Sequence, residues 1–526
     1  MAAPPLIGLL RQRPENPPPP RRPEFSTNRR AGCADARPHF PRSAAWWVIG
    51  LLVFGCAGDG QRESARSIFG ASAGAEGEAP ALVKVRAELG LVDDASLTAQ
   101  VARIGRSVAR PASVRSVVPS FHVVDQADAN VFSVSDEFVF VTRGLLALVA
   151  NEAELANLIA HELAHSEIGD LPVAASGLAA LGIGSAVMQA AVGRRPRVRF
   201  AAGASLVGHF AVDSESDADA LGQQNAAAAG FDAAALVDAF RGLHGVRRAR
   251  AASMPDFFDR HPSSPERAAR AMARANALAK SHATAGAGTR PMGWLEGLLV
   301  GLNPADGVFV GDRFVHHDLG YSLRLPRGWR PLHSRRAVGA VSPDGHAQVV
   351  LERQGPSGPP DEAGRIFLAE LAGRMRIRVE SRAGLRSAGL PAYRAIAFAD
   401  TPAGWVRLEL HWFTLATGVF RLVAASPPEG AETAEVAMRN VARSLQPLGD
   451  RERAKIREER LRFVTSTAGE TLEQLSRRSR NAWSSELTAA INRLGPDQVL
   501  EAGTRIKVAV LAPFRGRDLG ANPVRR

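Results

Sequence analysis

The sequence predicts an α+β chain, in which a mainly helical region with a small sheet precedes a sheet-rich region and a short module of mixed structure. Apolar residues recur at helical spacing through much of residues 95–280, whereas alternating strands dominate residues 313–448. Residues 463–512 then follow a strand, helix, helix and strand order. With 526 residues, 45% of them apolar, the chain is long enough for three or more cores.

Residues 1–55 are expected to lie outside these cores, as an N-terminal extension and a signal peptide. Met1 to Ser43 is Pro-rich and holds eight arginines against three acids, so it adds to the net charge of +12 without forming a core. The rest of the chain is only mildly basic. It has no interleaved aromatic and basic pattern, and we therefore expect no nucleic-acid partner.

An uncharged apolar run from Ala44 to Gly55 ends at Cys56 and is too short to span a bilayer comfortably. It indicates a signal peptide, and its ending, Val53-Phe54-Gly55-Cys56, resembles a bacterial lipobox. That resemblance implies acylation of Cys56 and a lipid anchor, and Ala57 in place of Asp implies the outer membrane, facing the periplasm. A buried apolar segment with a free thiol is the alternative. The second cysteine, Cys33, would be removed, so no disulfide is expected.

Residues 56–94 are predicted to form a tether and a helix over Pro80–Leu91. A second helix is expected at Ala95–Val108, and alternation predicts strands at Val117–Val124 and Phe138–Val141. The latter strand leads into a helix near Gly144. These segments begin the predicted helical domain of residues 95–280.

The stretch Asn151–Asp170 combines a helical pattern with the sequence H-E-x-x-H. His161 and His165 lie one helical turn apart on one face, where they can share a cation. Glu162 lies one step round the helix, close enough to accept a proton from water. Apolar residues at helical spacing predict that the helix is buried: Leu155, Leu158, Ile159 and Leu163. A chance pentapeptide on a solvated helix is the alternative reading of an isolated match.

A catalytic zinc usually takes three protein ligands and keeps one position for water, so a third ligand is expected downstream. Ile168 and Leu171 stand where the metzincin arrangement requires Gly and His, which excludes that class. Glu167 is near in sequence, but it follows His165 by only two residues and therefore points to the other side of the helix.

Glu215 is the predicted third ligand, and Asp219 lies one helical turn after it. Asp219 would accept the free ring N–H of a zinc histidine and fix its tautomer. We therefore expect one Zn²⁺ per chain, held by His161, His165 and Glu215.

Four ordered motifs carry a family resemblance, which covers about Ala95 to Lys280. The motifs are Asn130-Val131-Phe132, the run from Phe138 to His165, the run from Glu215 to Gly222 followed by Ala229-Gly230-Phe231-Asp232, and the run from His261 to Ala271. They resemble the gluzincin family of the CAAX prenyl protease, the HtpX-type heat-shock proteases and the periplasmic β-barrel assembly-enhancing protease. Two departures concern the substrate side: Ser135-Asp136-Glu137 replaces the usual Pro-Gly-Gly, and Arg260 replaces the usual Thr.

The resemblance also implies roles around the substrate. The strand at Phe138–Val141 would form the sheet edge beside the zinc, to which an extended substrate adds, and Asn130 and Phe132 would belong to this substrate edge. An ordinary core strand is the alternative. His261 and Arg267 would donate hydrogen bonds to the negative oxygen that develops during hydrolysis. Two alternatives stay open: His261 closes the fourth metal position in a resting state, or Arg267 only braces the fold by pairing with an acid such as Asp219.

The uncharged run Val173–Val192 is rich in Gly and Ala. We expect a helix packed over the site or against the membrane, and a transmembrane span is the alternative.

The second half of the chain changes character. After a Gly/Pro-punctuated linker at residues 281–312, residues 313–448 predict an antiparallel sheet with helices at Pro360–Arg376 and Glu432–Leu445. Leu325–Trp329 makes this domain similar to PsbP-like domains, and no chemistry is assigned to it. A linker helix at residues 449–462, a module at 463–512 and a basic tail at 513–526 complete the chain. The module resembles LysM and would bind peptidoglycan, and a small cap without a ligand is the alternative.

These expectations define a lipid-anchored zinc endopeptidase of the bacterial cell envelope, acting on unfolded or misassembled envelope polypeptides. The rival is a non-catalytic, peptidoglycan-associated scaffold or chaperone with a structural zinc. Such a site would need a fourth protein ligand, for which His261 is the candidate.

Overall fold

The computed structural model describes residues 79–110, 118–135, 137–168, 212–249, 257–259, 261–281, 292–333, 335, 337–373, 375–401 and 404–516. The N-terminal extension, Cys56 and the apolar run Val173–Val192 lie outside these residues. Within the described ranges, no helix combines the length and apolar character needed to cross a membrane.

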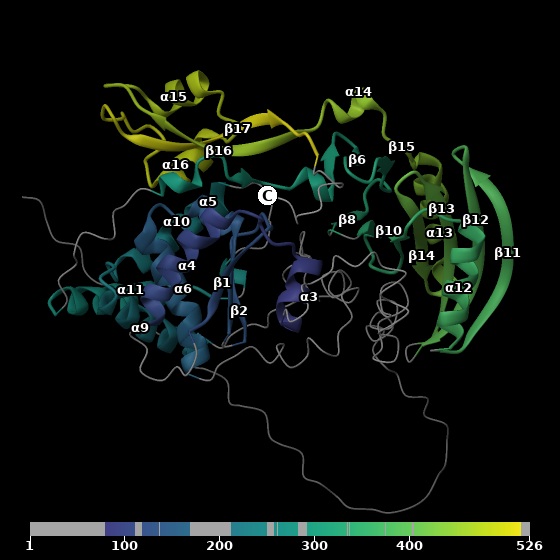
Figure 1. The fold of residues 1–526 in the computed structure, drawn as a ribbon, viewed down its shortest axis with the longest axis horizontal. Coiled ribbons are helices and arrows are strands. Elements are labelled where there is room, and N and C mark those ends of the chain that lie inside the picture. The colour runs from purple at the N-terminus through teal and green to yellow at the C-terminus, as the bar shows by residue number, and fades with distance from the viewer. Residues whose placement is uncertain are drawn as a thin grey trace, which may run out of the picture. The chain divides into compact units, whose positions relative to one another are not determined.

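The first part of the chain is mainly helical, as predicted (Figure 1). Its helices are α3 (Pro80–Glu88), α4 (Ala95–Ala109), α5 (Arg143–Leu148), α6 (Glu152–Glu167), α9 (Val212–Ala228), α10 (Ala235–Ala249) and α11 (Pro265–Ala279). Its strands are β1 (Ser120–Val124), β2 (Val131–Ser135) and β3 (Phe138–Thr142). They form a small sheet in the order β1-β3-β2, with β1 parallel and β2 antiparallel to β3.

Helix α6, which carries the H-E-x-x-H sequence, is buried along almost its whole length. Its side chains from Glu152 to His165 are all buried, and α4, α9, α10 and β2 pack around it. Asn151 caps the helix, because its Oδ1 accepts a hydrogen bond from Glu154 N at 3.0 Å. The predicted buried helix is therefore confirmed, and it holds both histidines in a rigid frame.

Gly222 allows α9 to lie directly against α6. A Cβ atom at this position would lie 2.8 Å from the backbone nitrogen of His161 and 2.9 Å from its Cα. Only glycine fits such a backbone approach, so Gly222 sets the spacing between the helix with the two histidines and the helix with Glu215.

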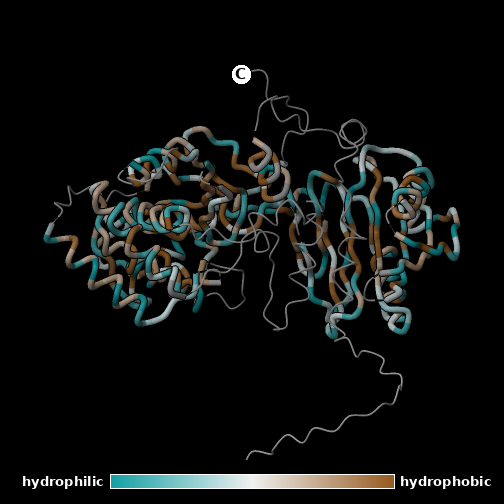
Figure 2. The backbone as a smooth tube through the Cα atoms, turned by 90° about the horizontal axis from the view of Figure 1, so that it is seen from below, coloured by the Kyte–Doolittle hydropathy of each residue, from teal (hydrophilic) through white to brown (hydrophobic). Residues whose placement is uncertain are grey.

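The sheet-rich part of the chain contains a seven-stranded antiparallel sheet in the order β11-β12-β13-β14-β10-β9-β8. The strands are β8 (Arg330–His333), β9 (Ala337–Val341), β10 (Gln348–Gly355), β11 (Ile377–Ser387), β12 (Leu390–Thr401), β13 (Gly404–Leu415) and β14 (Gly418–Ser426). Helix α12 (Pro360–Ala372) packs on one face and α13 (Ala431–Ser444) on the other. Successive side chains of a strand point to opposite faces of the sheet. In β13, Trp412 therefore packs on the side of α12 and Phe413 on the side of α13. Figure 2 shows the hydrophobic stretches that these central strands carry.

A second, smaller sheet flanks this part in the order β15-β7-β6-β5. It consists of β5 (Val308–Val310), β6 (Arg313–His316), β7 (Tyr321–Arg324) and β15 (Gln446–Pro447). The expected α+β domain with an antiparallel sheet is thus confirmed, with α12 ending at Ala372 rather than at Arg376.

The last part has the predicted order of strand, two helices and strand: β16 (Arg457–Thr465), α15 (Leu472–Ser479), α16 (Ser485–Asn492) and β17 (Arg505–Pro513). Strands β16 and β17 pair antiparallel. The helix predicted for residues 449–462 is wrong for most of that range, because α14 covers only Asp450–Arg453 and β16 begins at Arg457. Strand β4 (Leu299–Val300), within the predicted linker, adds to the other edge of β16.

This last part shares a hydrophobic core with the helical part. Leu461, Ile491 and Ala509 are buried in the same cluster as the apolar residues of α4, α6 and α10. Two basic side chains join the parts as well. Arg493 contacts the carboxylate of Glu154 in α6 at 2.6 Å, and the buried amine of Lys507 donates to the carbonyl oxygens of Ala147 and Val149.

Candidate metal centre

Three side chains from two helices bring their ligand atoms together in the helical part. The Nε2 atoms of His161 and His165 lie 3.1 Å apart. Glu215, from α9, places Oε2 at 3.5 Å from His161 Nε2 and Oε1 at 3.5 Å from His165 Nε2. All three side chains are fully buried. Glu167 does not belong to this cluster, and its carboxylate lies 3.5 Å from Asn225 Nδ2 instead.

The spacing of these atoms fits a zinc ion. Four ligands at about 2.0–2.1 Å from a tetrahedral centre lie about 3.3 Å from one another. The separations of 3.1 and 3.5 Å bracket that value. Two imidazole nitrogens and one carboxylate are also the donor set of many catalytic zinc sites. The residues present therefore suit the metal predicted from the sequence.

Asp219 orients His161 from the side opposite to the cluster. Its Oδ1 lies 2.9 Å from His161 Nδ1, so the Nδ1 proton can be donated to the carboxylate and Nε2 is left facing the other ligand atoms. The position is the one predicted for Asp219 from its spacing to Glu215.

Arg267, in the first turn of α11, pairs with two carboxylates of α9, those of Glu215 and Asp219. It contacts Asp219 through Nε at 2.7 Å and Nη2 at 2.8 Å, and Glu215 through Nη1 at 2.6 Å. Its Nη1 also donates to the carbonyl oxygen of Pro262, and Phe240 lies against the guanidinium, which is 2% exposed. Every strong contact of this arginine is thus with groups of the fold, an arrangement that favours the bracing role.

The charges of the cluster shift the pKa values of its members. Burial alone would lower the pKa of His161, but Asp219 and Glu215 outweigh it and raise the pKa to about 9. Burial would raise the pKa of Glu215, yet its hydrogen bonds to the three histidines hold that pKa far below the usual range. The carboxylate is therefore ionised at any ordinary pH, as a metal ligand must be.

His261 joins the cluster from the segment before α11. Its Nδ1 lies 3.2 Å from His161 Nε2 and 3.0 Å from Glu215 Oε1, so it faces the same point as the three expected ligands. Its Nε2 lies 2.9 Å from Oε1 of Glu162. Burial would raise the pKa of Glu162, but the contact with His261 outweighs it and lowers that pKa. His261 therefore stands between the expected metal ligands and the expected base.

Two further residues support the site, and the sequence alone did not indicate them. Phe257 stacks on the ring of His261 with centroids 4.2 Å apart and an interplanar angle of 14°. Gln223 of α9 donates to the carbonyl oxygens of Ala233 and Ala271 at 2.9 and 2.8 Å, which ties α9 to α11. Gln223 follows Glu215 by two helical turns, but its partners are set by the tertiary fold.

The prediction that Phe138–Val141 forms the sheet edge is wrong, because β3 is the central strand and pairs with β1 on one side and β2 on the other. The outer strand that follows Asn130 is β2, which packs against α6. Asn130 directly precedes β2, and Phe132 stacks on Phe140 at 5.2 Å. Both side chains are buried.

A family model matches this part of the chain. Residues 95–275 match the model of Peptidase family M48, and this range contains His161, Glu162, His165, Glu215 and His261. No curated protein matches the chain. The match supports a metallopeptidase, so the expected class of hydrolase is confirmed at that level.

Solved structures give weaker likenesses. LpqN of Mycobacterium tuberculosis, involved in cell envelope biogenesis, is similar at 14% identity over 26% of this chain and 88% of its own, with a TM-score of 0.22. PsbP (CyanoP) of Synechocystis sp. PCC 6803 is similar at 11% identity over 27% of this chain and 95% of its own, with a TM-score of 0.23. Scores this low carry no argument, and the PsbP-like and LysM-like assignments stay predictions.

Proposed function

We propose that the protein is a zinc-dependent endopeptidase of the bacterial cell envelope, which hydrolyses peptide bonds of misfolded or misassembled envelope proteins. One observation carries the enzymatic part of the proposal. His161, His165 and Glu215 converge with Glu162 beside them, inside the region that matches a metallopeptidase family.

The residues of the candidate metal centre have separate roles in this reaction. His161, His165 and Glu215 would hold the ion, which when bound supplies Lewis acidity toward a carbonyl oxygen and lowers the pKa of water. Glu162 is ionised and accepts the proton of the attacking water, then passes it to the leaving amine. Asp219 keeps His161 in the tautomer that presents Nε2, and Arg267 holds Asp219 and Glu215 in place.

His261 supports a resting state in this proposal. Its Nδ1 points at the ligand cluster and its Nε2 at Glu162, so it closes the fourth ligand position and covers the base at the same time. Substrate can reach Glu162 only after the imidazole turns away. Once displaced, it can serve as a hydrogen-bond donor to the developing negative oxygen.

Casein cleavage tests the enzymatic proposal. The purified protein should release peptides from casein, and Glu162→Gln or a chelator should abolish the release. Casein that stays uncleaved after prolonged incubation with the wild type is compatible with a closed resting state. If the His261→Ala variant, in which the fourth ligand position is open, also leaves casein uncleaved, the enzymatic proposal is contradicted.

The same assay separates the roles of His261 and Arg267 when zinc content is measured alongside. A faster His261→Ala variant indicates a lid, and a variant slowed about 100- to 1000-fold with its zinc retained indicates an oxyanion donor. For Arg267→Ala we expect a lower free energy of unfolding or a lower zinc content, because Arg267 holds Asp219 and Glu215 in place. Unchanged rates in both variants would leave only a structural role.

Metal content tests the ligand assignment without reference to activity. Elemental analysis should find one zinc per chain, and His161→Ala, His165→Ala and Glu215→Ala should each lose most of it. Stoichiometric zinc in Glu215→Ala would move the third ligand elsewhere.

The second candidate is a non-catalytic envelope scaffold with a structural zinc. It is favoured by the position of His261, which would complete four protein ligands, the number typical of structural zinc sites. In that case His261→Ala would weaken zinc binding and folding and would yield no peptidase activity.

The envelope location and the partners are part of the proposal. A palmitate analogue should label the protein in a bacterial host, and Cys56→Ser should abolish both the label and the association with the outer membrane. Residues 463–512 should retain the protein on isolated peptidoglycan. An unlabelled, soluble wild-type protein would contradict the lipid anchor.

A further inference from the structure

A pocket of about 450 Å³ lies between α10 and α11, outside the candidate metal centre. Its volume is within the range of about 300–1,000 Å³ that is common for ligand sites. One face of α10 and the segment from Ser263 to Met272 line it. Phe240 also lies against Arg267, but none of the other lining side chains has a role in the candidate metal centre.

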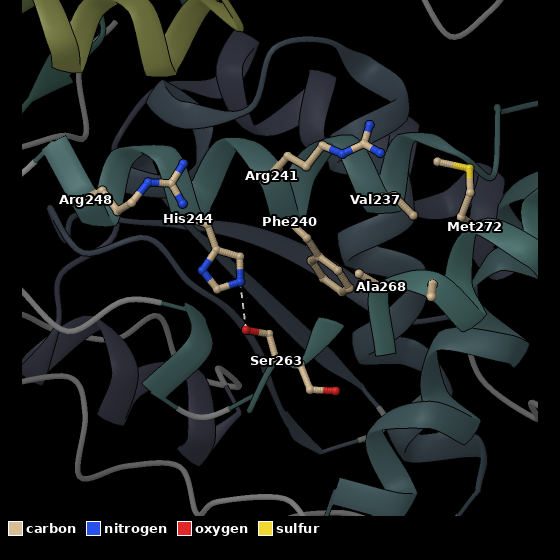
Figure 3. A pocket seen from close by; sticks show the side chains of 10 residues that line it. Val237, Phe240, Arg241, His244, Arg248, Ser263, Ala268 and Met272 are labelled. Atoms are coloured by element: carbon tan, nitrogen blue, oxygen red, sulfur yellow. Dashed lines mark hydrogen bonds between the residues drawn. The ribbon is translucent and has the colours of Figure 1, made fainter. Parts of the chain in front are cut away.

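The pocket has a polar end and an apolar end (Figure 3). Arg248, His244 and Ser263 form the polar end, where Ser263 Oγ and His244 Nε2 lie 2.8 Å apart. Val237 and Met272 lie toward the other end, with the ring of Phe240 between the two. An occupant should therefore carry a polar group and an apolar group a few ångströms apart.

The charge of the pocket is positive. Arg241 and Arg248 line it, and no acid belongs to the lining among the described residues. Burial and the nearby charges of Arg247 and Arg248 lower the pKa of His244, so its ring adds no positive charge at neutral pH. Arg241 pairs with Asp238 at 3.1 Å on the exposed rim, whereas Arg248 has no ion-pair partner in the described part of the chain. The first turn of α11 is already capped by Ser264, whose Oγ accepts from Arg267 N. The attraction for an anion thus comes from the side chains of α10.

The polar end is connected to the candidate metal centre by short contacts. Ser263 follows His261 by two residues. The ring of His244 stacks on Phe258 at 4.0 Å, and Phe257 stacks on His261 at 4.2 Å. A chain bound in the pocket would therefore lie on the segment that positions His261.

We propose that this pocket binds the last residue of a polypeptide. Its α-carboxylate would be held by Arg248 and by the one proton that the hydrogen-bonded pair of His244 and Ser263 leaves free. Its apolar side chain would lie against Phe240 and Met272. A C-terminal residue carries both groups on one Cα atom, which matches the two ends of the pocket. An acidic side chain within a chain carries only the first. The proposal deepens the proposed function by naming free, apolar chain ends as the substrate feature, and it rests on that function for the identity of the occupant.

Binding to a variant without turnover tests this proposal separately from peptidase activity. Full-length Glu162→Gln protein is titrated against a peptide with an N-terminal fluorophore and a C-terminal Leu, and anisotropy gives the Kd. The matched peptides end in Leu-amide or in Ser. We expect roughly tenfold weaker binding for the amide, because a charge-assisted contact is lost, and weaker binding for the Ser peptide as well.

The variants Arg248→Gln and Arg247→Gln form the matched pair. They change the same charge at neighbouring exposed positions of α10, but only Arg248 lines the pocket. Arg248→Gln should weaken the carboxylate peptide about tenfold and leave the amide peptide unchanged, and Arg247→Gln should alter neither by more than about twofold.

Three outcomes would overturn the proposal. They are equal Kd values for the acid and the amide, equal effects of the two variants, and an Arg248-dependent affinity for vesicles of anionic phospholipid without any for the peptides, which would assign the pocket to a lipid headgroup. Because Glu162→Gln cannot turn over substrate, none of these results depends on whether the wild type cleaves casein.

Discussion

Substitution of Gly222 tests the close approach of α9 to α6 that assembles the candidate metal centre. A Cβ atom there would lie 2.8 Å from His161 N, whereas ordinary contacts begin at 3.4 Å, so Gly222→Val must push α9 away by about 0.6 Å. Overpacking of this kind costs about 1–3 kcal/mol in the free energy of unfolding. Glu215 lies two helical turns earlier on α9, and its carboxylate should be displaced with the helix.

The displacement should weaken zinc binding at least about tenfold, since a metal site tolerates misplacement of only about 0.5 Å. Competition with a chromophoric chelator gives the zinc affinity, and urea unfolding gives the stability. Ala228→Val is the control, because it adds the same β-branched side chain to an exposed position of the same helix. If Gly222→Val kept the zinc affinity and stability of Ala228→Val, the spacing of the two helices could not be what organises the ligands.

Three further experiments probe the buried charges. Arg267→Met should lower the free energy of unfolding of the metal-free protein by about 3–5 kcal/mol, because Asp219 loses its bidentate partner, and urea unfolding with and without the second change Asp219→Leu should show partial recovery. Burial lowers the pKa of Lys507 to about 7 from the ordinary value of 10.5. Between these two pH values the unfolded chain binds one proton more than the folded chain. The free energy of unfolding should therefore rise with pH in this range. Lys507→Met should remove this rise in urea unfolding at about pH 6.5 and 9.5, and an unchanged slope would contradict it. A double-mutant cycle of Arg493→Met and Glu154→Gln should give a coupling of about 1–3 kcal/mol, and additive effects would deny the contact.

The sequence predicted the parts of the site that depend on spacing within one helix. The four-residue intervals from His161 to His165 and from Glu215 to Asp219 each define one face, and the structure brings these two faces together. A periodic pattern indicates which residues share a face but not how closely two helices pack. The role of Gly222 could not be predicted for that reason.

Contacts between distant segments escaped the sequence for a related reason. The sequence left two roles for Arg267, an oxyanion donor and a brace, because a charged residue at the start of a helix suits both. Its contacts with Asp219 and Glu215 depend on how α9 and α11 cross, which the sequence does not give. The strand at Arg457 was mistaken for helix because its charged residues, RERAKIREER over residues 451–460, favour a helix locally. Pairing with β4 and β17 overrides that preference.

The common core of the helical part and the last part affects the order in which the chain can fold. Lys507 reaches the carbonyl oxygen of Val149, 358 residues earlier, and Leu461 and Ile491 complete the cluster around α6. The polypeptide emerges from the ribosome from its N-terminal side, so α6 and α9 appear long before the residues that close their core. During that interval apolar surface around the peptidase helices stays uncovered, and the metal ligands lack a rigid frame. A rigid metal centre should therefore form only after β16, α16 and β17 have been synthesised.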